Sequence, residues 1–278
     1  MKDLLKAPFI KEIARTCSNM YRLGWDERNA GNISLLLEDG VIDKYLDATK
    51  VIRVIDIKFD ASPLLGKIFV VSGTGKYFKN VEYEPEVNLG ILRISGDGSK
   101  ADLLWGLSDG GGPTSELPAH FMSHIERLKV DPLNRVVTHC HATNLVAMTY
   151  IHSLDERAFT RTLWKMSIEA IIVFPDGVSV LPWMLCGTES IGLATAEKMR
   201  VSRLCVWAHH GIFGAGKTLD EAFGLIETAE KAATLYTTVM NARLLNTITD
   251  EQLRILADTF NVPYRTDYLD PIIKTVNV

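Results

Sequence analysis

The stretch Arg135-Val-Val-Thr-His139-Cys-His141 decides the fold and carries the first candidate site. Its short β-branched run predicts a buried strand. Because side chains alternate along a strand, His139 and His141 point to one face and Cys140 points to the other. Two imidazoles on one face can bind the same metal ion, whereas a zinc site needs three or four ligands. The alternative is a pair of polar residues at a strand end, hydrogen-bonded to their neighbours.

The composition describes a soluble globular protein. The chain has 278 residues, is 47% hydrophobic and carries a net charge of −4, which gives no sign of nucleic-acid or membrane-surface binding. Its charged N-terminus does not resemble a signal peptide, and no apolar run is long enough to span a bilayer. Four scattered cysteines without a C-x-x-C pair suggest free thiols. We therefore expect a cytoplasmic protein that binds neither nucleic acid nor membranes.

Strand and helix patterns are mixed along the whole chain. Helical periodicity predicts helices at 9–24, 115–128, 144–166, 188–200, 219–243 and 250–260. Apolar runs predict strands at 33–37, 51–57, 68–71, 170–174 and 204–208, besides a hairpin of 89–94 and 101–105. No repeat or linker-like break interrupts the sequence. We expect an α/β fold, a single domain of residues 1–278 in which helices flank a mixed, largely antiparallel central sheet.

A third histidine for the pair is available at the end of the predicted strand 204–208. His209 and His210 stand directly before Gly211, where a glycine turn lets ligands converge. Alternation places only one of the two toward the site, and the residues alone do not decide which. Three histidines with an open fourth position are the arrangement of a catalytic zinc.

A carboxylate candidate lies in the predicted helix 115–128. Glu116 falls in its first turn, with Thr114 or Ser115 available as the N-cap. There the helix dipole favours a negative charge, so ordinary helix stabilisation is the alternative to a catalytic role. His120 and His124 are one turn apart, but the H-E-x-x-H motif is absent. We interpret those two as helix-surface histidines.

The segment Gly211–Thr218 matches the P-loop pattern G-x-x-x-x-G-K-[ST]. The residues that follow read as helix, with no later strand for the acidic residue that holds the metal in nucleotide-binding proteins. We therefore favour a tight turn followed by an N-cap box, Thr218-Leu-Asp-Glu221. Nucleotide binding is kept as the alternative.

Two turns are suited to bind an anion. Asn29-Ala-Gly31-Asn32 and Ser72-Gly-Thr74-Gly75 offer backbone N–H groups, amides and hydroxyls. Such turns are also common without a ligand. Thr114 and Ser115, at a predicted helix N-terminus, can supply a third wall.

Taken together, these motifs resemble the zinc-dependent class II sugar-phosphate aldolases. The resemblance covers nearly the whole chain, from Gly24 to Glu230. The matching motifs are Asn-x-Gly-Asn, Ser-Gly-Thr-Gly, Thr-Ser-Glu-Leu-Pro-x-His, Thr-His-Cys-His-Ala-Thr and His-His-Gly, in this order. Flanking runs at 24–29, 104–107, 174–178 and 181–184 look like the members that act on L-rhamnulose 1-phosphate. The irregular stretch 38–67 fits these members, whereas fuculose-phosphate aldolases and ribulose-phosphate epimerases are shorter there.

The resemblance implies a set of site residues. The family ligand directly precedes the glycine, so one Zn²⁺ per subunit is expected on His139, His141 and His210. Glu116 matches the acid/base carboxylate, which in this family can also touch the metal, and Glu169 matches a second carboxylate contributed by a neighbouring subunit. Phosphate contacts fall on Asn29, Gly31, Asn32, Thr74, Gly75 and Ser115. A fourfold-symmetric homotetramer with active sites at the subunit interfaces is implied.

The activity implied is reversible cleavage of L-rhamnulose 1-phosphate to dihydroxyacetone phosphate and L-lactaldehyde, in rhamnose catabolism. Zinc would stabilise the enediolate and Glu116 would exchange the proton, so no lysine Schiff base is needed at Lys76. The alternatives are a related fuculose-phosphate aldolase or sugar-phosphate 4-epimerase, a P-loop phosphotransferase, and a non-catalytic interaction module. The chain departs from the family pattern at Gly110–Gly112, an unusually flexible run, and at His209, which replaces an apolar residue.

Overall fold

The computed structural model describes residues 1–271. Nine strands form one sheet in the order β2-β5-β4-β3-β1-β6-β9-β8-β7. They are β1 (Asn32–Leu36), β2 (Arg53–Asp56), β3 (Ile68–Ser72), β4 (Leu89–Ser95), β5 (Lys100–Gly106), β6 (Val136–Cys140), β7 (Val178–Leu181), β8 (Leu204–Trp207) and β9 (Gly211–Gly216). Within residues 1–271, only β7 and β8 pair in parallel, and the other neighbouring strands are antiparallel. The expected mixed, largely antiparallel sheet is thereby confirmed.

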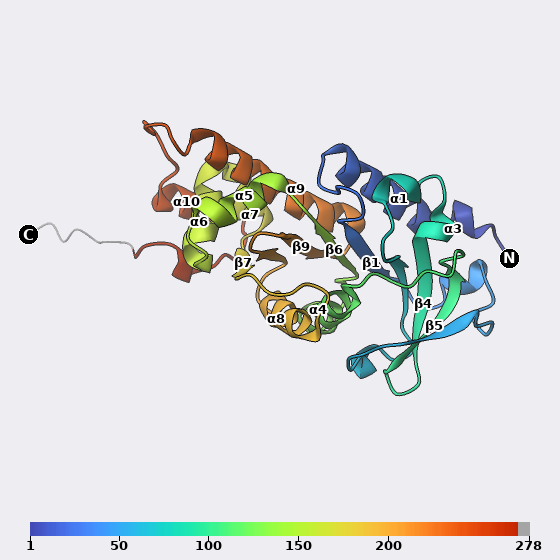
Figure 1. Ribbon diagram of the computed structural model, residues 1–278. Coiled ribbons are helices and arrows are strands. Elements are labelled where there is room, and N and C mark those ends of the chain that lie inside the picture. Colours follow the sequence, from blue (N-terminus) through green and yellow to red (C-terminus); the bar gives the residue numbers. More distant parts are fainter. Residues whose placement is uncertain (272–278) are drawn as a thin grey trace, which may run out of the picture.

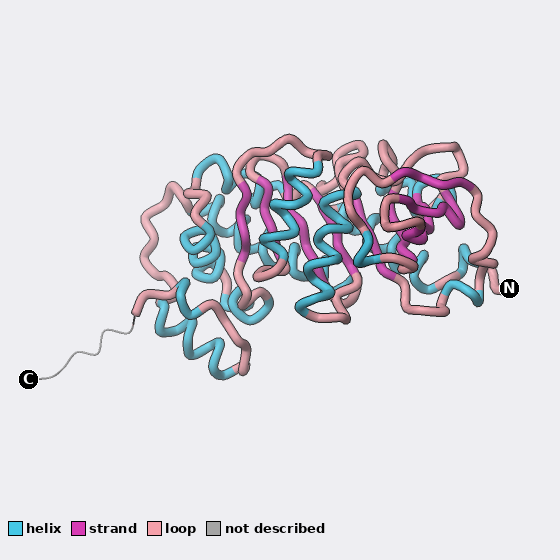
Figure 2. Tube along the Cα trace, turned by 90° about the horizontal axis from the view of Figure 1, so that it is seen from below, coloured by secondary structure: helices cyan, strands magenta, loops and turns pink. Residues whose placement is uncertain are grey.

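Helices cover both faces of this sheet (Figure 1). They are α1 (Pro8–Arg22), α2 (Phe78–Val81), α3 (Pro85–Asn88), α4 (Leu117–Val130), α5 (Thr143–Ile151), α6 (Glu156–Met166), α7 (Ile168–Val173), α8 (Glu189–Met199), α9 (Leu219–Val239) and α10 (Asp250–Thr259). Helices α1, α5 and α9 lie on one face, and α4 and α8 lie on the other, where Figure 2 shows them crossing the strands. Within residues 1–271, no helix is both long and apolar enough to cross a membrane.

The apolar faces of these elements explain the layering. Ile13 of α1 and Ala229 of α9 are fully buried in the same cluster as Val136 of β6. On the opposite face, Phe121 of α4 is fully buried against β3, with its ring centroid 4.6 Å from that of Phe69. The central strands are therefore covered on both sides, which is why every residue of β6 is buried, including the polar Thr138 and His139.

The prediction of a strand at 170–174 is wrong, because this run forms helix α7 (Ile168–Val173). A short apolar run fits a buried strand and one side of a buried helix equally well, so periodicity cannot separate the two. The strand of this region comes later, as β7, after a turn in which Gly177 has a φ of +78°.

The prediction of a tight turn at Gly211–Gly216 is also wrong, because the segment is strand β9, paired with β6 and β8. A Cβ on Gly214 would lie 2.9 Å from the Ile226 side chain, and one on Gly216 would lie 2.8 Å from the Ala222 nitrogen. These glycines therefore let α9 approach the sheet rather than form a phosphate loop. The predicted cap is confirmed, since Thr218 Oγ1 accepts a 3.1 Å hydrogen bond from Glu221 N–H.

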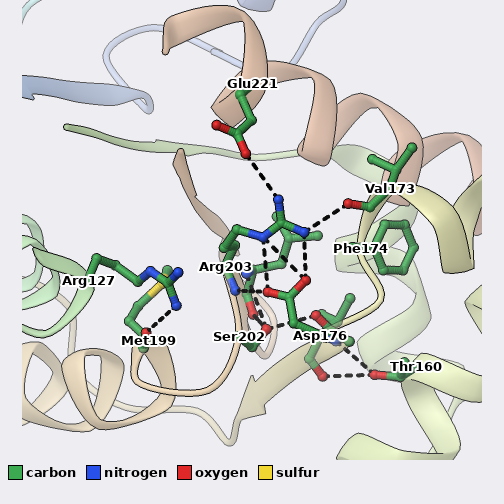
Figure 3. A network of polar contacts seen from close by, with 12 residues as sticks. Arg127, Thr160, Val173, Phe174, Asp176, Met199, Ser202, Arg203 and Glu221 are labelled. Carbon is green, nitrogen blue, oxygen red and sulfur yellow. Dashed lines mark hydrogen bonds and ion pairs between the residues drawn. The ribbon is translucent and has the colours of Figure 1, made fainter. Parts of the chain in front are cut away.

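A network of ion pairs joins β8 to its surroundings (Figure 3). The Arg203 guanidinium donates to Asp176 at 2.8 Å, to Glu221 at 3.1 Å and to the Val173 carbonyl at 2.9 Å. The backbone N–H of Arg203 donates to the same Asp176 carboxylate at 2.7 Å. One side chain thus connects α7, the turn before β7, and α9.

Candidate metal centre and active site

Three histidines meet in the middle of the sheet, where strand β6 ends and strand β9 begins. His139 is the last residue but one of the buried strand β6, His141 follows the strand, and His210 lies in the turn before β9. Because β6 and β9 are antiparallel neighbours, the end of one strand lies beside the start of the other. One ring nitrogen from each histidine lies within 4.8 Å of the others.

In the turn from β8 to β9, the side chains of His209 and His210 point in different directions. His209 has a φ of +64°, in the left-handed region, and its N–H donates to Thr149 Oγ1 at 3.0 Å. Its ring packs against Tyr150, with centroids 4.3 Å apart, and is exposed. His209 is therefore directed toward α5, while His210 faces the other two histidines.

The tautomers of His139 and His141 follow from their neighbours. The ring nitrogen Nδ1 of His139 donates to the Ile212 carbonyl at 3.0 Å, and that of His141 donates to Glu27 at 2.7 Å. Both acceptors offer only lone pairs, so each Nδ1 carries the proton and each Nε2 carries a lone pair. Both Nε2 atoms are buried without a hydrogen-bond partner. Converging imidazole lone pairs are the donor set that a divalent metal takes, so these residues fit a metal ion.

Glu27 is a site residue that the sequence reasoning missed. It lies in the turn between α1 and β1, 114 positions from its partner His141. Desolvation raises the pKa of this carboxyl, but the hydrogen bond from His141, a backbone hydrogen bond and the nearby His141 and His210 together outweigh it and leave the pKa below its ordinary value. A carboxylate that accepts from the outer nitrogen of a metal-ligating histidine fixes the ring and strengthens it as a ligand.

The Glu116 carboxylate lies close to the ring nitrogens of His139 and His210. Its Oε2 lies 3.7 Å from His139 Nε2, and its Oε1 lies 3.8 Å from His210 Nε2. Helix α4 begins at Leu117, later than predicted, so Glu116 itself occupies the N-cap, and neither Thr114 nor Ser115 does. Thr114 Oγ1 instead accepts from the Glu116 N–H at 3.2 Å. Desolvation raises the pKa of Glu116 to about 7, although a hydrogen bond from Asn32 acts against this rise.

A buried chain of hydrogen bonds leads away from Glu116. Asn32 Nδ2 donates to Glu116 Oε2 at 2.9 Å, and Asn32 Oδ1 accepts from His120 Nε2. Ser34 Oγ then donates to His120 Nδ1 at 2.7 Å and accepts from His124 Nε2 at 2.9 Å. Both histidines have no exposed surface, so the interpretation of His120 and His124 as helix-surface residues is wrong. Their burial lowers the pKa of each to about 3, which keeps them neutral.

The three turns expected to bind phosphate lie side by side. Thr114 N–H donates to the Ser72 carbonyl at 2.9 Å, and Thr74 N–H donates to the Gly112 carbonyl at 2.9 Å. Ser72 Oγ accepts from Ile33 N–H at 3.1 Å, which adds the turn before β1. Four of the predicted residues are exposed there, namely Asn29, Thr74, Gly75 and Ser115.

The other two predicted phosphate residues have partners within the chain. The Asn32 amide is occupied by Glu116 and His120. The Gly31 N–H donates at 3.2 Å to Asp26, which also accepts from Phe78 N–H at 3.1 Å. A Cβ at Gly31 would lie 2.6 Å from the Phe78 ring, so this glycine serves the close packing of the turn.

Glu169 stands apart from the histidines. It lies exposed on helix α7, and the groups of possible metal ligands found among residues 1–271 do not include it.

The glycine run that departs from the family pattern is held by hydrogen bonds. Arg53 donates to the carbonyls of Gly110 and Gly111, which holds the glycine run in place.

Gly211 packs directly against the rings of His139 and His141. A Cβ at this position would lie 2.5 Å from the Cys140 carbonyl oxygen, 2.7 Å from His139 Cε1 and 3.0 Å from His141 Cδ2. Any side chain there would displace the rings. Cys140 itself is fully buried, and burial raises the pKa of its thiol, as expected for a core residue on the far face of β6.

Comparisons with known proteins agree with this geometry. The family described as "Class II Aldolase and Adducin N-terminal domain" matches residues 11–237. The chain is 60% identical to a rhamnulose-1-phosphate aldolase of Listeria innocua, covering 97% of this chain and 99% of that protein. It is 56% identical to one of Enterococcus faecalis, covering 96% of both. A sugar-phosphate aldolase structure from Thermotoga maritima superposes with a TM-score of 0.73 at 28% identity, covering 84% of this chain and 96% of that one. The chain therefore belongs to the class II aldolase and adducin N-terminal domain family.

Proposed function

We propose that this chain catalyses the reversible aldol cleavage of L-rhamnulose 1-phosphate to dihydroxyacetone phosphate and L-lactaldehyde. The observation that carries the proposal is the convergence of three histidine nitrogens within 4.8 Å, with the Glu116 carboxylate 3.7 Å from His139. The substrate follows from the names of relatives that are 56–60% identical over almost the whole chain.

His139, His141 and His210 would hold one divalent ion per subunit, which we take to be zinc. When bound, the ion supplies Lewis-acid stabilisation of the negative charge that develops on the substrate as its carbon–carbon bond breaks. The two unpartnered Nε2 atoms support this assignment, because a buried nitrogen lone pair without a donor is costly unless a ligand fills the space.

Glu116 is proposed to move the proton at the reacting carbon. A carboxyl with a pKa of about 7 is available both as a base and as an acid near neutral pH. Asn32 holds one of its oxygens, which leaves the carboxylate directed at the space between His139 and His210.

The exposed residues Asn29, Thr74, Gly75 and Ser115 are proposed to bind the substrate phosphate. They lie on turns that are hydrogen-bonded to one another next to Glu116. Lys76, the lysine nearest to these turns in sequence, pairs with Asp109 and so has a partner of its own. Binding through neutral groups positions the substrate without adding a second strong positive charge beside the metal.

We further propose a cytoplasmic homotetramer in which Glu169 of one subunit acts at the site of a neighbour. The exposure of Glu169 on α7 supports the second part, since the side chain is free to meet another surface.

The test is an aldol-cleavage assay on L-rhamnulose 1-phosphate, L-fuculose 1-phosphate and L-ribulose 5-phosphate, with and without a chelator. We expect cleavage of the first substrate, inhibited by chelation and restored by zinc. Preferred cleavage of the second, or epimerisation of the third, would reassign the substrate within the family. Chelator-insensitive, ATP-dependent activity would instead favour the phosphotransferase.

Glu116→Gln separates catalysis from binding. The amide keeps the shape of the side chain but cannot take up a proton, so turnover should fall roughly 10²–10⁴-fold. Zinc content and substrate affinity should stay near those of the wild type. A fully active variant would exclude the role assigned to Glu116.

A further inference from the structure

One buried carboxylate near the site has no part in the proposed chemistry, and it belongs to Asp26. This residue follows helix α1 and is only 2% exposed. Its Oδ1 accepts hydrogen bonds from the N–H groups of Ala30 at 3.1 Å and Gly31 at 3.2 Å. Its Oδ2 accepts from Phe78 N–H at 3.1 Å. Three backbone donors on one carboxylate offset the cost of burying its charge, and they join two segments that are distant in the sequence.

The first of these segments is the turn that carries Asn29, one of the residues proposed to bind the substrate phosphate. Arg28, in the same turn, has a φ of +59°. This left-handed conformation is unfavourable for a residue with a Cβ, so it persists only where neighbouring contacts enforce it. The two hydrogen bonds to Asp26 Oδ1 close the chain around Arg28 and thereby hold Asn29 in place.

The second segment follows the other proposed phosphate turn, which carries Thr74 and Gly75. Phe78 is the first residue of helix α2, three positions after Gly75. Its ring also packs against the first turn, because a Cβ on Gly31 would lie 2.6 Å from Phe78 Cε2. The two turns therefore meet through one carboxylate and one aromatic ring.

The residues on either side of Asp26 hold a proposed metal ligand. The Trp25 carbonyl accepts from His141 N–H at 2.9 Å, and Glu27 accepts from His141 Nδ1 at 2.7 Å. Three consecutive residues thus contact both halves of the site. Trp25 and Glu27 hold the histidine, while Asp26 holds the turns.

We propose that Asp26 is a positioning residue that fixes the two phosphate-binding turns relative to the metal ligands. The inference rests on the proposed function, because it takes these turns to bind the substrate phosphate. Binding groups hold a ligand well only when the residues behind them fix their position. A carboxylate suits this place because both of its oxygens only accept, whereas an amide or a hydroxyl would turn a hydrogen toward one of the N–H groups.

The test is the full enzyme with Asp26→Asn, which keeps the shape of the side chain but loses one accepting oxygen. The KM for L-rhamnulose 1-phosphate should rise roughly tenfold or more, the effect expected from losing a hydrogen bond to a charged group. The inhibition constant of inorganic phosphate should rise by a similar factor, while kcat and zinc content stay near those of the wild type. Asp176→Asn is the matched control, since Asp176 accepts a backbone N–H from Arg203 at 2.7 Å away from the site. It should leave both constants unchanged.

A second variant, Gly31→Ala, keeps Asp26 and carries the test even if Asp26→Asn does not fold. Its methyl group would press on the Phe78 ring and separate the two turns, so the same two constants should rise. Wild-type values of KM and of phosphate inhibition in these variants would overturn the inference. Loss of zinc from Asp26→Asn with unchanged phosphate inhibition would also overturn it, because Asp26 would then serve the metal ligands. Absence of aldol cleavage by the wild type would instead overturn the proposed function.

Discussion

The side-chain amide of Asn32 donates a 2.9 Å hydrogen bond to Glu116, and both residues are almost completely buried. The other end of that amide accepts from His120, which in turn is held by Ser34. The orientation of the proposed acid/base group is therefore fixed by a strand residue and a helix residue that lie 88 positions apart.

Asn32→Ala should lower kcat more than it raises KM. The change removes the group that orients Glu116, whereas the proposed phosphate contacts at Thr74 and Ser115 remain. Steady-state kinetics with L-rhamnulose 1-phosphate provide the measurement, with Asn29→Ala as the matched control that should mainly raise KM. The same large rise in KM for both variants would instead assign Asn32 to the phosphate, as the family resemblance implies.

Glu27→Gln should weaken metal binding by roughly 10–100-fold, because Glu27 accepts the Nδ1 proton of His141 and an amide is a poorer acceptor. Competition with a chelator of known zinc affinity measures the effect. The control is Glu82→Gln, since Glu82 accepts from Ser18 away from the site. Equal zinc affinities for the wild type and Glu27→Gln would show that this hydrogen bond does not tune the ligand.

The buried histidines should make the metal-free protein sensitive to acid. Burial lowers the pKa of His124 from 6.5 to about 3. Between pH 6.5 and about 3, the unfolded chain therefore binds a proton at His124 that the folded chain does not bind. The stability associated with neutral His124 is therefore complete above pH 6.5 and is lost as the pH falls toward 3.

His124→Gln should flatten this dependence by up to ~1.4 kcal/mol per pH unit between pH 4 and 6, the slope associated with one proton. Urea unfolding of the metal-free protein at several pH values gives the slopes. His152→Gln is the control, because His152 hydrogen-bonds to Thr162 outside the buried network. Parallel curves for the wild type and His124→Gln would contradict the prediction.

Arg203→Met should destabilise the fold by ~2–4 kcal/mol, because it leaves the Asp176 carboxylate partly buried without its partner. The two side chains are only 20% and 22% exposed. The control is Arg15→Met, which breaks an ion pair with Asp220 whose side chains are 57% and 77% exposed. That change should stay within ~1 kcal/mol of the wild type. Similar unfolding midpoints for both variants in urea would argue against the Arg203 network as a stabilising unit.

The parts of the fold that were predicted correctly depend on local patterns. The hairpin of β4 and β5 and the capped helix α8 are each encoded within one short, continuous stretch of sequence. Strand parity likewise put His139 and His141 on one side and Cys140 on the other. The run at 170–174 failed because its apolar residues do not distinguish a short buried helix from a strand.

The parts that were missed depend on contacts between distant segments. The burial of His120 and His124 follows from Ser34, which lies 86 and 90 positions away and meets both rings on β1. Helical spacing alone gives no information on what lies opposite. Glu27 likewise enters the site from a loop, whose course is set by the ends of the elements that it connects.

The close packing at Gly211 has a consequence for protein engineering, because this position must be kept unchanged while other parts of the site can be varied. Even a methyl group at this position would push into two ligand rings and the backbone between them, so mutant libraries that include position 211 would consist largely of inactive clones. The loop 182–188 between β7 and α8, whose Cys186 lies near Glu116 and His210, carries the exposed side chains of Trp183 and Leu185. Altered aldehyde preference should therefore be sought by varying this loop, while Gly211 and the three histidines are kept the same in every variant.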